Sequence, residues 1–374
     1  MSQVWDFLIA GAGPAGSRAA ELLARGGAGV LLLDPKAPWE KPCGGGLSAA
    51  ALAHTPELAD LRDQWELVRE ILVVAPSGAC ATVPLTRPFA VVSRQALSRW
   101  GLERATGAGA RFEREAVRSV ERLDGEWRVA DSRGRSFCAR WLVGADGAAS
   151  RLRGWLAPGL RPELAPTRVA YPTAGAPPGT AVLLLLPSSK GYLWDFPRPD
   201  HRSVGVALAP GTFGREVLDR MIQAYLPGAE SDPPRWTSCG AAVPTRRWRS
   251  GRYRDLGTSD YALLGDAAGL ADPLTEEGID YALQSAALAV AAFDQRLGFR
   301  RYPRAMRRAL RPDTLRWRVT DLLYRPAVVE RLVRRAGRRW MEGRVVMALM
   351  DALNEHLSLP QLARRIVAAP AAAT

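Results

Sequence analysis

Apolar runs and helical periodicity alternate at the start of the chain. Residues 4–10 (VWDFLIA) and 30–33 (VLLL) are largely apolar, as in strands that are buried on both faces. Residues 17–25 (SRAAELLAR) place apolar side chains at helical spacing. The order strand, helix, strand predicts a βαβ unit and therefore a parallel sheet.

A different pattern occupies residues 183–208, which we expect to form antiparallel strands. Side chains alternate along a strand, so Tyr192, Trp194 and Phe196 share one face. This aromatic stripe is either the wall of an apolar binding site or ordinary sheet core.

The last quarter of the chain has helical patterns. Residues 279–293 are the most apolar helical segment, but Asp280 and Gln284 interrupt it and it is too short to span a membrane. From residue 299 onward, arginines alternate with apolar residues at helical spacing. This basic region either lies on an anionic membrane surface or forms a solvated helical cap.

Composition narrows the class of protein. Of the 374 residues, 47% are hydrophobic and 24% charged, which suits two or three packed units. The net charge of +13 comes almost wholly from arginine, because Lys36, Lys41 and Lys190 are the only lysines. No nucleic-acid-binding motif accompanies this charge, so we expect no nucleic-acid partner.

Cysteine and histidine usage excludes further classes. Cys43, Cys80, Cys138 and Cys239 form no CxxC pair, and the three histidines are far apart. We therefore expect no metal site, no disulfide framework and no serine–histidine catalysis. No signal-peptide pattern precedes the first strand, so we expect a cytoplasmic protein, with peripheral contact to the inner face of the membrane as an option for the basic region.

The first strand and helix are joined by GAGPAG, residues 11–16. Gly11 permits a tight turn, Gly13 lets backbone N–H groups approach a pyrophosphate, and Gly16 allows close packing of helix on strand. Asp34 follows the second strand and can accept hydrogen bonds from a ribose diol. This order predicts a dinucleotide-binding unit, with FAD and NAD both open.

Two later segments repeat the arrangement of strand, small-residue turn and acid. Asp146 lies in GADG, residues 144–147, and Asp266 directly follows Gly265. Each turn either brings a carboxylate near sugar or ribityl hydroxyls or is an ordinary turn with a capping aspartate. Two additional turns of this kind exceed what a nicotinamide domain needs, which favours FAD.

A thiol directly precedes three glycines in KPCGGGLS, residues 41–48. Consecutive glycines weaken helices and strands, so they usually mark backbone that approaches another group closely or takes positive φ. The segment is either such a close approach, with a bulky group lying against it, or a flexible loop that contains a cysteine.

Together these motifs resemble the geranylgeranyl reductase family of FAD-dependent oxidoreductases, within the aromatic-hydroxylase-like flavoproteins. The match runs in order from residue 4 to about residue 293 and includes SRQALSRW, GYLWDFP and GDAAGLADPLTEEGI; PCGGGL and GYLWDFP are its most specific parts. The resemblance implies FAD as cofactor and reduction of double bonds in the prenyl chain of an isoprenoid lipid or pigment precursor. The implied substrate is thus a hydrophobic small molecule.

The resemblance also implies roles for individual residues. On the adenosine side of FAD it suggests Ala15 and Asp34, with Val117 at the adenine and Arg94 at the pyrophosphate region. On the flavin side the implied residues are Cys43, Gly44, Gly46, Asp266 at the ribityl chain, and Gly278 and Ile279 at the pyrimidine edge. Apart from the resemblance, the shared face of Tyr192, Trp194 and Phe196 would suit contact with a flexible prenyl substrate, with sheet core as the alternative. The chain departs from the family at Asp34, where glutamate is usual, and at Glu276, where glycine is usual.

Two of these positions have a chemical rationale. Reducing an isolated alkene needs a hydride and a proton, and the thiol of Cys43 is a candidate catalytic proton donor because an ordinary thiol is mostly protonated at neutral pH. The alternative is that Cys43 packs as a small apolar residue. Gly278 opens an apolar helix, whose N-terminal partial positive charge could stabilise reduced flavin.

The expected fold class is α/β (α+β), with a Rossmann-type FAD-binding domain, an antiparallel β-sheet substrate domain and a C-terminal helical region. The expected boundaries are 1–69, 90–160 and 255–298 for the FAD-binding domain, 70–89 and 161–254 for the substrate domain, and 299–374 for the basic helical region.

Other functions remain open on the sequence. The same fold supports flavin-dependent monooxygenases and halogenases, and GYLWDFP also resembles the tryptophan-rich motif of the halogenases. In a different class, the chain could be a flavin electron carrier or a prenyl-binding protein without substrate chemistry. The electron donor is either NAD(P)H or another protein, because the absence of a second GxGxxG unit does not decide between them.

Overall fold

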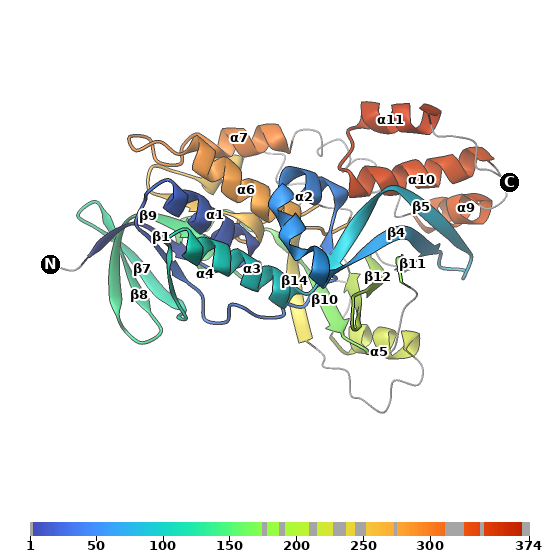
Figure 1. Cartoon of the computed structure of the whole chain (residues 1–374), viewed down its shortest axis with the longest axis horizontal. Helices are drawn as coiled ribbons and strands as arrows, with labels where there is room; N and C mark the ends of the chain where they lie inside the picture. The colour runs from blue at the N-terminus through green and yellow to red at the C-terminus, as the bar shows by residue number, and fades with distance from the viewer. Residues whose placement is uncertain are drawn as a thin grey trace. The chain divides into compact units, whose positions relative to one another are not determined.

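The computed structural model describes residues 3–173, 178–186, 191–208, 215–226, 237–243, 252–272, 275–310, 325–336 and 340–368. The chain forms two compact units (Figure 1). Unit 1 contains Met1–Glu40, Arg94–Glu163 and Ala241–Leu310, and unit 2 contains Lys41–Ser93, Leu164–Gly240 and Arg311–Thr374. These two units are groups of residues that contact one another. The FAD-binding and substrate domains expected from the sequence are functional divisions, so their boundaries stay a prediction.

Unit 1 is built on a mostly parallel sheet with an antiparallel extension. Its strand order is β6-β2-β1-β9-β8-β7, and β15 pairs with β9. β1 is parallel to β2 and β9, whereas β7, β8 and β9 are antiparallel neighbours. The strands are β1 (Val4–Ala10), β2 (Val30–Leu33), β6 (Arg111–Glu113), β7 (Val117–Leu123), β8 (Glu126–Asp131), β9 (Ser136–Gly144) and β15 (Tyr261–Leu263).

The register of this sheet brings four strand ends together. Ala10 of β1 is level with Leu33 of β2 and with Gly144 of β9, and Gly144 is level with Leu263 of β15. The segments that follow these strands therefore leave the sheet at one edge, which we call the carboxyl edge. In open parallel sheets this is the edge where ligands bind.

Helices cover the sheet of unit 1. They are α1 (Pro14–Arg25), α3 (Arg94–Gly107), α4 (Arg151–Leu156), α6 (Ile279–Ala292) and α7 (Tyr302–Ala309), with 3-10 helices at Arg252–Leu256 and Gly265–Ala268 (η5). α1 packs on both α3 and α6. Its buried Glu21 forms ion pairs with Arg18 and Arg25 of α1 and with Arg104 of α3, and the last of these ties α1 to α3.

Unit 2 is built on a mostly antiparallel sheet of order β14-β10-β13-β12-β11-β4-β5-β3. Only the β11–β4 pair is parallel among the strand pairs that the described residues define. The strands are β3 (Gly46–Leu47), β4 (Trp65–Val74), β5 (Cys80–Val92), β10 (Glu163–Ala170), β11 (Thr180–Leu185), β12 (Gly191–Pro197), β13 (Arg202–Leu208) and β14 (Thr237–Val243). The mixed α/β class with two sheets confirms the expected fold class.

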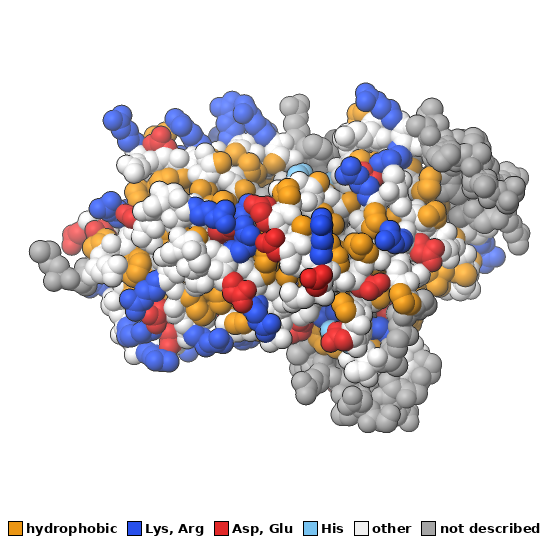
Figure 2. All heavy atoms as spheres, in the orientation of Figure 1, with side chains coloured by type: hydrophobic (Ala, Val, Ile, Leu, Met, Phe, Trp, Pro, Cys, Tyr) orange, Lys and Arg blue, Asp and Glu red, His pale blue; other side chains and the backbone are white. Residues whose placement is uncertain are grey.

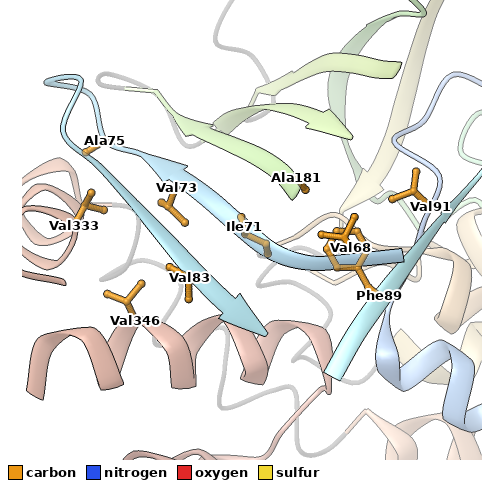
Figure 3. Close-up of a cluster of buried hydrophobic side chains, with 10 residues drawn as sticks. All are labelled: Val68, Ile71, Val73, Ala75, Val83, Phe89, Val91, Ala181, Val333 and Val346. Atoms are coloured by element: carbon orange, nitrogen blue, oxygen red, sulfur yellow. The ribbon is translucent and has the colours of Figure 1, made fainter. Parts of the chain in front are cut away.

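Helices pack on this sheet at two places. α5 (Arg215–Tyr225) buries Leu218 and Ile222 against a cluster that contains Leu193 of β12. α9 (Pro326–Ala336) and α10 (Trp340–Asn354) bury Val333 and Val346 against β4 and β5, in the cluster that Figure 3 shows. The other helices of unit 2 are α2 (Ala49–His54), a 3-10 helix at Pro56–Gln64, and α11 (Leu359–Ala368).

Polar contacts also attach α10 to the rest of unit 2. Asp351 accepts hydrogen bonds from the backbone N–H and the hydroxyl of Thr86, at 2.9 and 2.6 Å. Asn354 accepts one from the backbone N–H of Ala49 at 2.7 Å, at the start of α2. The C-terminal helices α9 and α10 are thus part of unit 2, while residues 311–324 of the basic region lie outside the described residues.

Within the described ranges, the structure contains no helix that is both long enough and apolar enough to cross a lipid bilayer.

Candidate functional site

The glycine turn after β1 has the geometry that the GAGPAG motif predicts. Gly11 has φ +100°, and a Cβ on it would lie 2.2 Å from the carbonyl oxygen of Ala145. A Cβ on Gly16 would lie 1.8 Å from the carbonyl oxygen of Gly11, so α1 can approach the turn only with glycine there. Ala15, in the first turn of α1, is buried.

Gly13 differs from these two glycines because a Cβ on it would meet nothing within 4 Å. It is the N-cap of α1, and no side chain caps the helix there. Uncapped N–H groups and the helix dipole make such a terminus an anion-binding site. Open space beside uncapped N–H groups is what a pyrophosphate needs, so the residues present fit the phosphates of a dinucleotide.

Asp34 lies at the carboxyl edge, directly after β2. Its carboxylate accepts hydrogen bonds from the backbone N–H groups of Ala12 (2.8 Å), Lys36 (2.7 Å) and Ala37 (2.9 Å). A carboxylate has about four acceptor positions, so roughly one remains for a ribose hydroxyl. Asp34 therefore also holds the glycine turn against the end of β2.

Val117 and Arg94 also belong to unit 1. The backbone N–H of Asp34 donates to the carbonyl of Glu113 at 3.2 Å, and the chain continues from there to Val117 at the start of β7. Arg94 begins α3 and is 7% exposed. Glu40 accepts hydrogen bonds from the backbone N–H groups of Arg94 (3.1 Å) and Gln95 (2.9 Å), which caps α3.

The first of the two later acids caps a helix. Asp146 accepts hydrogen bonds from the hydroxyl of Ser150 (2.5 Å) and from the backbone N–H groups of Arg151 (2.8 Å) and Leu152 (3.2 Å), all at the start of α4. This is the capping arrangement that the sequence left open as an alternative. A contact between Asp146 and a sugar stays a prediction.

The second acid lies beside the N-terminus of α6. Gly278 is the N-cap of this helix, and a Cβ on it would lie 3.1 Å from a carboxylate oxygen of Asp266. Gly265 has φ +51°, and its Cβ would lie 3.2 Å from Ala15 of α1 and 3.1 Å from Ala282 of α6. The structure therefore brings Gly265, Asp266, Gly278 and Ile279 together near the start of α1.

Glu276 occupies the position where the family usually has glycine, and its backbone explains that preference. Its φ is +56°, in the left-handed region that favours glycine. Burial raises the pKa of the Glu276 carboxyl to about 8, although part of its surface remains accessible.

We expect Glu276→Gln to stabilise the FAD-free protein more at about pH 8 than at about pH 4.5, the ordinary carboxyl pKa. Between these values the folded protein keeps the proton and the unfolded chain releases it, so wild-type stability falls as pH rises. Thermal unfolding at several pH values checks this. Glu103→Gln, at an exposed position of α3, is the matched control; a pH-independent difference for Glu276→Gln would contradict the expectation.

In unit 2, residues 43–46, which we call the Cys43 segment, lie on the aromatic stripe. A Cβ on Gly44 would lie 2.9 Å from the ring of Phe196 and 3.3 Å from the indole nitrogen of Trp194. Gly45 has φ +81°, and its Cβ would lie 2.2 Å from the carbonyl oxygen of Val92. Gly46 pairs with Val91 in the β3–β5 ladder. Packing within unit 2 therefore accounts for Gly44 and Gly45, whereas a Cβ on Gly46 would make only ordinary contacts, the nearest at 3.6 Å from Phe196.

The aromatic stripe has the expected common face. Tyr192, Trp194 and Phe196 contact one cluster, whereas Leu193 contacts the cluster under α5. Trp194 is only 5% exposed, and opposite it a Cβ on Gly205 would lie 2.1 Å from the indole. Trp194 thus packs as sheet core, while Tyr192 and Phe196 remain half-buried. Their contact with a substrate stays a prediction.

The backbone of Cys43 is held by two side chains that the sequence analysis missed. Its carbonyl oxygen accepts hydrogen bonds from the hydroxyl of Ser203 at 3.0 Å and from Nη2 of Arg198 at 3.2 Å. Its Sγ accepts one from the backbone N–H of Gly45 at 3.4 Å. In the sequence, both side chains lie in the stretch RPDHRS, which directly follows GYLWDFP. Polar residues placed directly after a buried strand could have indicated them.

Solved structures with the same fold define the class of protein. A geranylgeranyl bacteriochlorophyll reductase-like protein from Thermoplasma acidophilum has a TM-score of 0.72, with 19% identity over 98% of this chain and 97% of its own. The flavin-dependent brominase Bmp2 has a TM-score of 0.69, with 15% identity and 98% of each chain covered. The chain has the fold of flavin-dependent enzymes.

Relatives by sequence define the family, although the chain matches no protein-family model. Digeranylgeranylglycerophospholipid reductase 1 of Methanopyrus kandleri is 32% identical over 301 residues, 75% of this chain and 77% of the relative. Menaquinone reductase of Mycobacterium tuberculosis is 29% identical over 322 residues, 78% and 77% of the two chains. The chain belongs to the geranylgeranyl reductase family of FAD-dependent oxidoreductases and is an enzyme.

Proposed function

We propose that this enzyme reduces C=C double bonds in a prenyl chain of geranylgeranyl type, within an isoprenoid lipid or a pigment precursor. The observation that carries the proposal is the Cys43 segment, which presents a thiol from glycines packed on Phe196 and Trp194. Relatives named as reductases of digeranylgeranylglycerophospholipid and of menaquinone support a prenyl substrate. Half-buried Tyr192 and Phe196 offer apolar surface to such a chain.

FAD is the proposed cofactor, and unit 1 supplies the residues that would hold it. The uncapped start of α1 at Gly13 would bind the pyrophosphate, and Asp34 would accept a hydrogen bond from the ribose. Gly278 at the start of α6 adds partial positive charge, which favours an anionic group. When bound in its reduced form, FAD supplies the hydride for one alkene carbon.

Cys43 is proposed to supply the proton for the other carbon. The S–H bond breaks, a C–H bond forms, and the thiolate takes a proton from solvent to complete the cycle. The backbone N–H of Gly45 already donates to Sγ and is placed to stabilise that thiolate. The alkene gains two hydrogens, one from each donor.

The test is mass spectrometry of a prenyl-lipid extract after anaerobic incubation with photoreduced protein. The proposal expects lipids heavier by two hydrogens and reoxidation of the protein by the extract. Reoxidation by oxygen alone, with no hydrogenated lipid, would support a monooxygenase or halogenase. Reoxidation by an acceptor protein alone would support an electron carrier.

NAD(P)H is the proposed electron donor. Anaerobic mixing of the oxidised protein with NADH or NADPH should bleach the flavin absorbance. A flavin that stays oxidised with both would point to a donor protein.

We further propose peripheral membrane contact through basic helices, since a prenyl lipid resides in a membrane. Figure 2 shows basic side chains over α7, where Arg304, Arg307 and Arg308 are exposed. The apolar face of α7 is already buried in unit 1, including Met306. Contact with a membrane would therefore be electrostatic rather than by insertion.

We expect binding to anionic vesicles to fall steeply as salt rises, because exposed charges are screened beyond about 8–10 Å at physiological ionic strength. Replacing Arg304, Arg307 and Arg308 by glutamine should weaken this binding, by about 1 kcal/mol per arginine at the surface. Vesicle co-sedimentation measures it. Equal partitioning to neutral and anionic vesicles would favour the solvated-cap alternative.

A further inference from the structure

The Cys43 segment is anchored by the hairpin that carries the aromatic stripe. Ser203 of β13 and Arg198, between β12 and β13, both donate to the carbonyl oxygen of Cys43. Ser203 is fully buried and Arg198 is 5% exposed. Hydrogen bonds in such surroundings fix geometry well, because water does not compete for the carbonyl.

Each of the two donors is itself oriented by a neighbour. The indole N–H of Trp194 donates to the hydroxyl of Ser203 at 3.3 Å, which leaves the hydroxyl hydrogen for the carbonyl of Cys43. The guanidinium of Arg198 lies over the ring of Tyr171, 4.9 Å from its centroid, and its Nη1 is 3.1 Å from Nε2 of His201. Trp194 and Tyr171 thus set the directions of the two hydrogen bonds.

His201 lies against Arg198 on the side away from Cys43. Its Nε2 is 3.1 Å from Nη1 of Arg198, and its Nδ1 is 2.6 Å from a carboxylate oxygen of Asp200. The side-chain hydrogen bond with His201 lowers the pKa of Asp200. Arg198 is therefore held at both ends of its guanidinium, by the carbonyl of Cys43 and by the ring of His201.

The geometry points to Arg198 and Ser203 as positioning residues of the reaction. They hold the backbone of Cys43 so that its thiol remains where it can deliver a proton. The inference rests on the proposed role of Cys43, but the anchoring itself can be measured without any substrate.

The test is Arg198→Lys, because an ammonium group cannot bridge the carbonyl of Cys43 and the ring of His201 as a planar guanidinium does. Alkylation of Cys43 by iodoacetamide, relative to the exposed Cys80 of the same protein, should rise severalfold. Alkene reduction should slow by about tenfold to a hundredfold, the effect of misplacing a reacting group by about 1 Å, with FAD content unchanged.

Arg168→Lys is the matched control. Arg168 is also buried in the sheet of unit 2, at 3% exposure, and it forms a bidentate pair with Asp219 at 2.5 and 3.0 Å. The same chemical change at this position should leave the alkylation ratio and the reduction rate at wild-type values. Ser203→Ala, which removes only a hydroxyl, is a second variant of the anchor should Arg198→Lys fold poorly.

The outcomes separate the two proposals. If Arg198→Lys and Ser203→Ala both show the wild-type alkylation ratio and the wild-type rate of alkene reduction, the positioning role is overturned. Slower alkene reduction with an unchanged alkylation ratio also overturns it, because the backbone of Cys43 has then not moved. A wild type that hydrogenates no alkene, in which Arg198→Lys nevertheless exposes Cys43, refutes the proposed function and leaves the anchoring standing.

Discussion

Cys43→Ala is expected to slow substrate-dependent reoxidation of the reduced protein by about two to four orders of magnitude, the usual contribution of a positioned general acid. Alanine keeps the Cβ and the following glycines, so the Cys43 segment should stay packed on Trp194 and Phe196. The glycine turn of GAGPAG lies in unit 1, so FAD content and anaerobic photoreduction should persist. Stopped-flow absorbance under anaerobic conditions measures the rate.

Cys43→Ser is the companion variant. Serine has nearly the same shape, but an alcohol is a far weaker acid than a thiol, so it should restore little of the rate. If both variants reoxidise at the wild-type rate, Cys43 is a packing residue and the proton comes from water or another group.

Asp34→Ala is expected to weaken FAD binding by about 1.5–3 kcal/mol, or roughly 10- to 150-fold in Kd. The variant loses a charged acceptor for the ribose and also the hydrogen bond that holds the N–H of Ala12. Fluorescence of FAD released on dilution gives the Kd.

Asp6→Ala is the control for that variant. Asp6 lies on β1 and accepts a hydrogen bond from the N–H of Gly29 at 2.8 Å, away from the carboxyl edge. It should leave FAD retention unchanged. Unchanged FAD occupancy in Asp34→Ala would contradict the ribose assignment.

Local patterns made unit 1 predictable. β1 covers Val4–Ala10 and β2 covers Val30–Leu33, as the apolar runs indicated, because a strand buried on both faces needs continuous apolar residues. Gly11 and Gly16 have the geometry that the motif requires, and Gly278 caps α6 as expected. Each of these features depends on residues that are close in sequence.

Features that depend on distant residues could not be read from the sequence. The glycines after Cys43 face Phe196 and the carbonyl of Val92, and the sequence does not show which residues a glycine run will meet. Likewise, the carboxylate of Asp146 could serve a sugar or a helix, and only the structure shows that it caps α4. Amphipathic patterns in α9 and α10 predicted helices but not that β4 and β5 are their partners.

The attachment of α10 has a consequence for how the protein folds. Asn354 caps α2 at Ala49, a position 305 residues earlier, and Asp351 binds Thr86 across 265 residues. Such separations give a high contact order, which slows folding because a long loop must close before the contact forms. Ser48 caps α2 locally by accepting from the backbone N–H of Ala51, so the bond from Ala49 to Asn354 adds a second, long-range attachment only after α10 has been synthesised. The start of α2 and the middle of β5 therefore gain their last contacts late, and chains that end before Asp351 should lack both attachments.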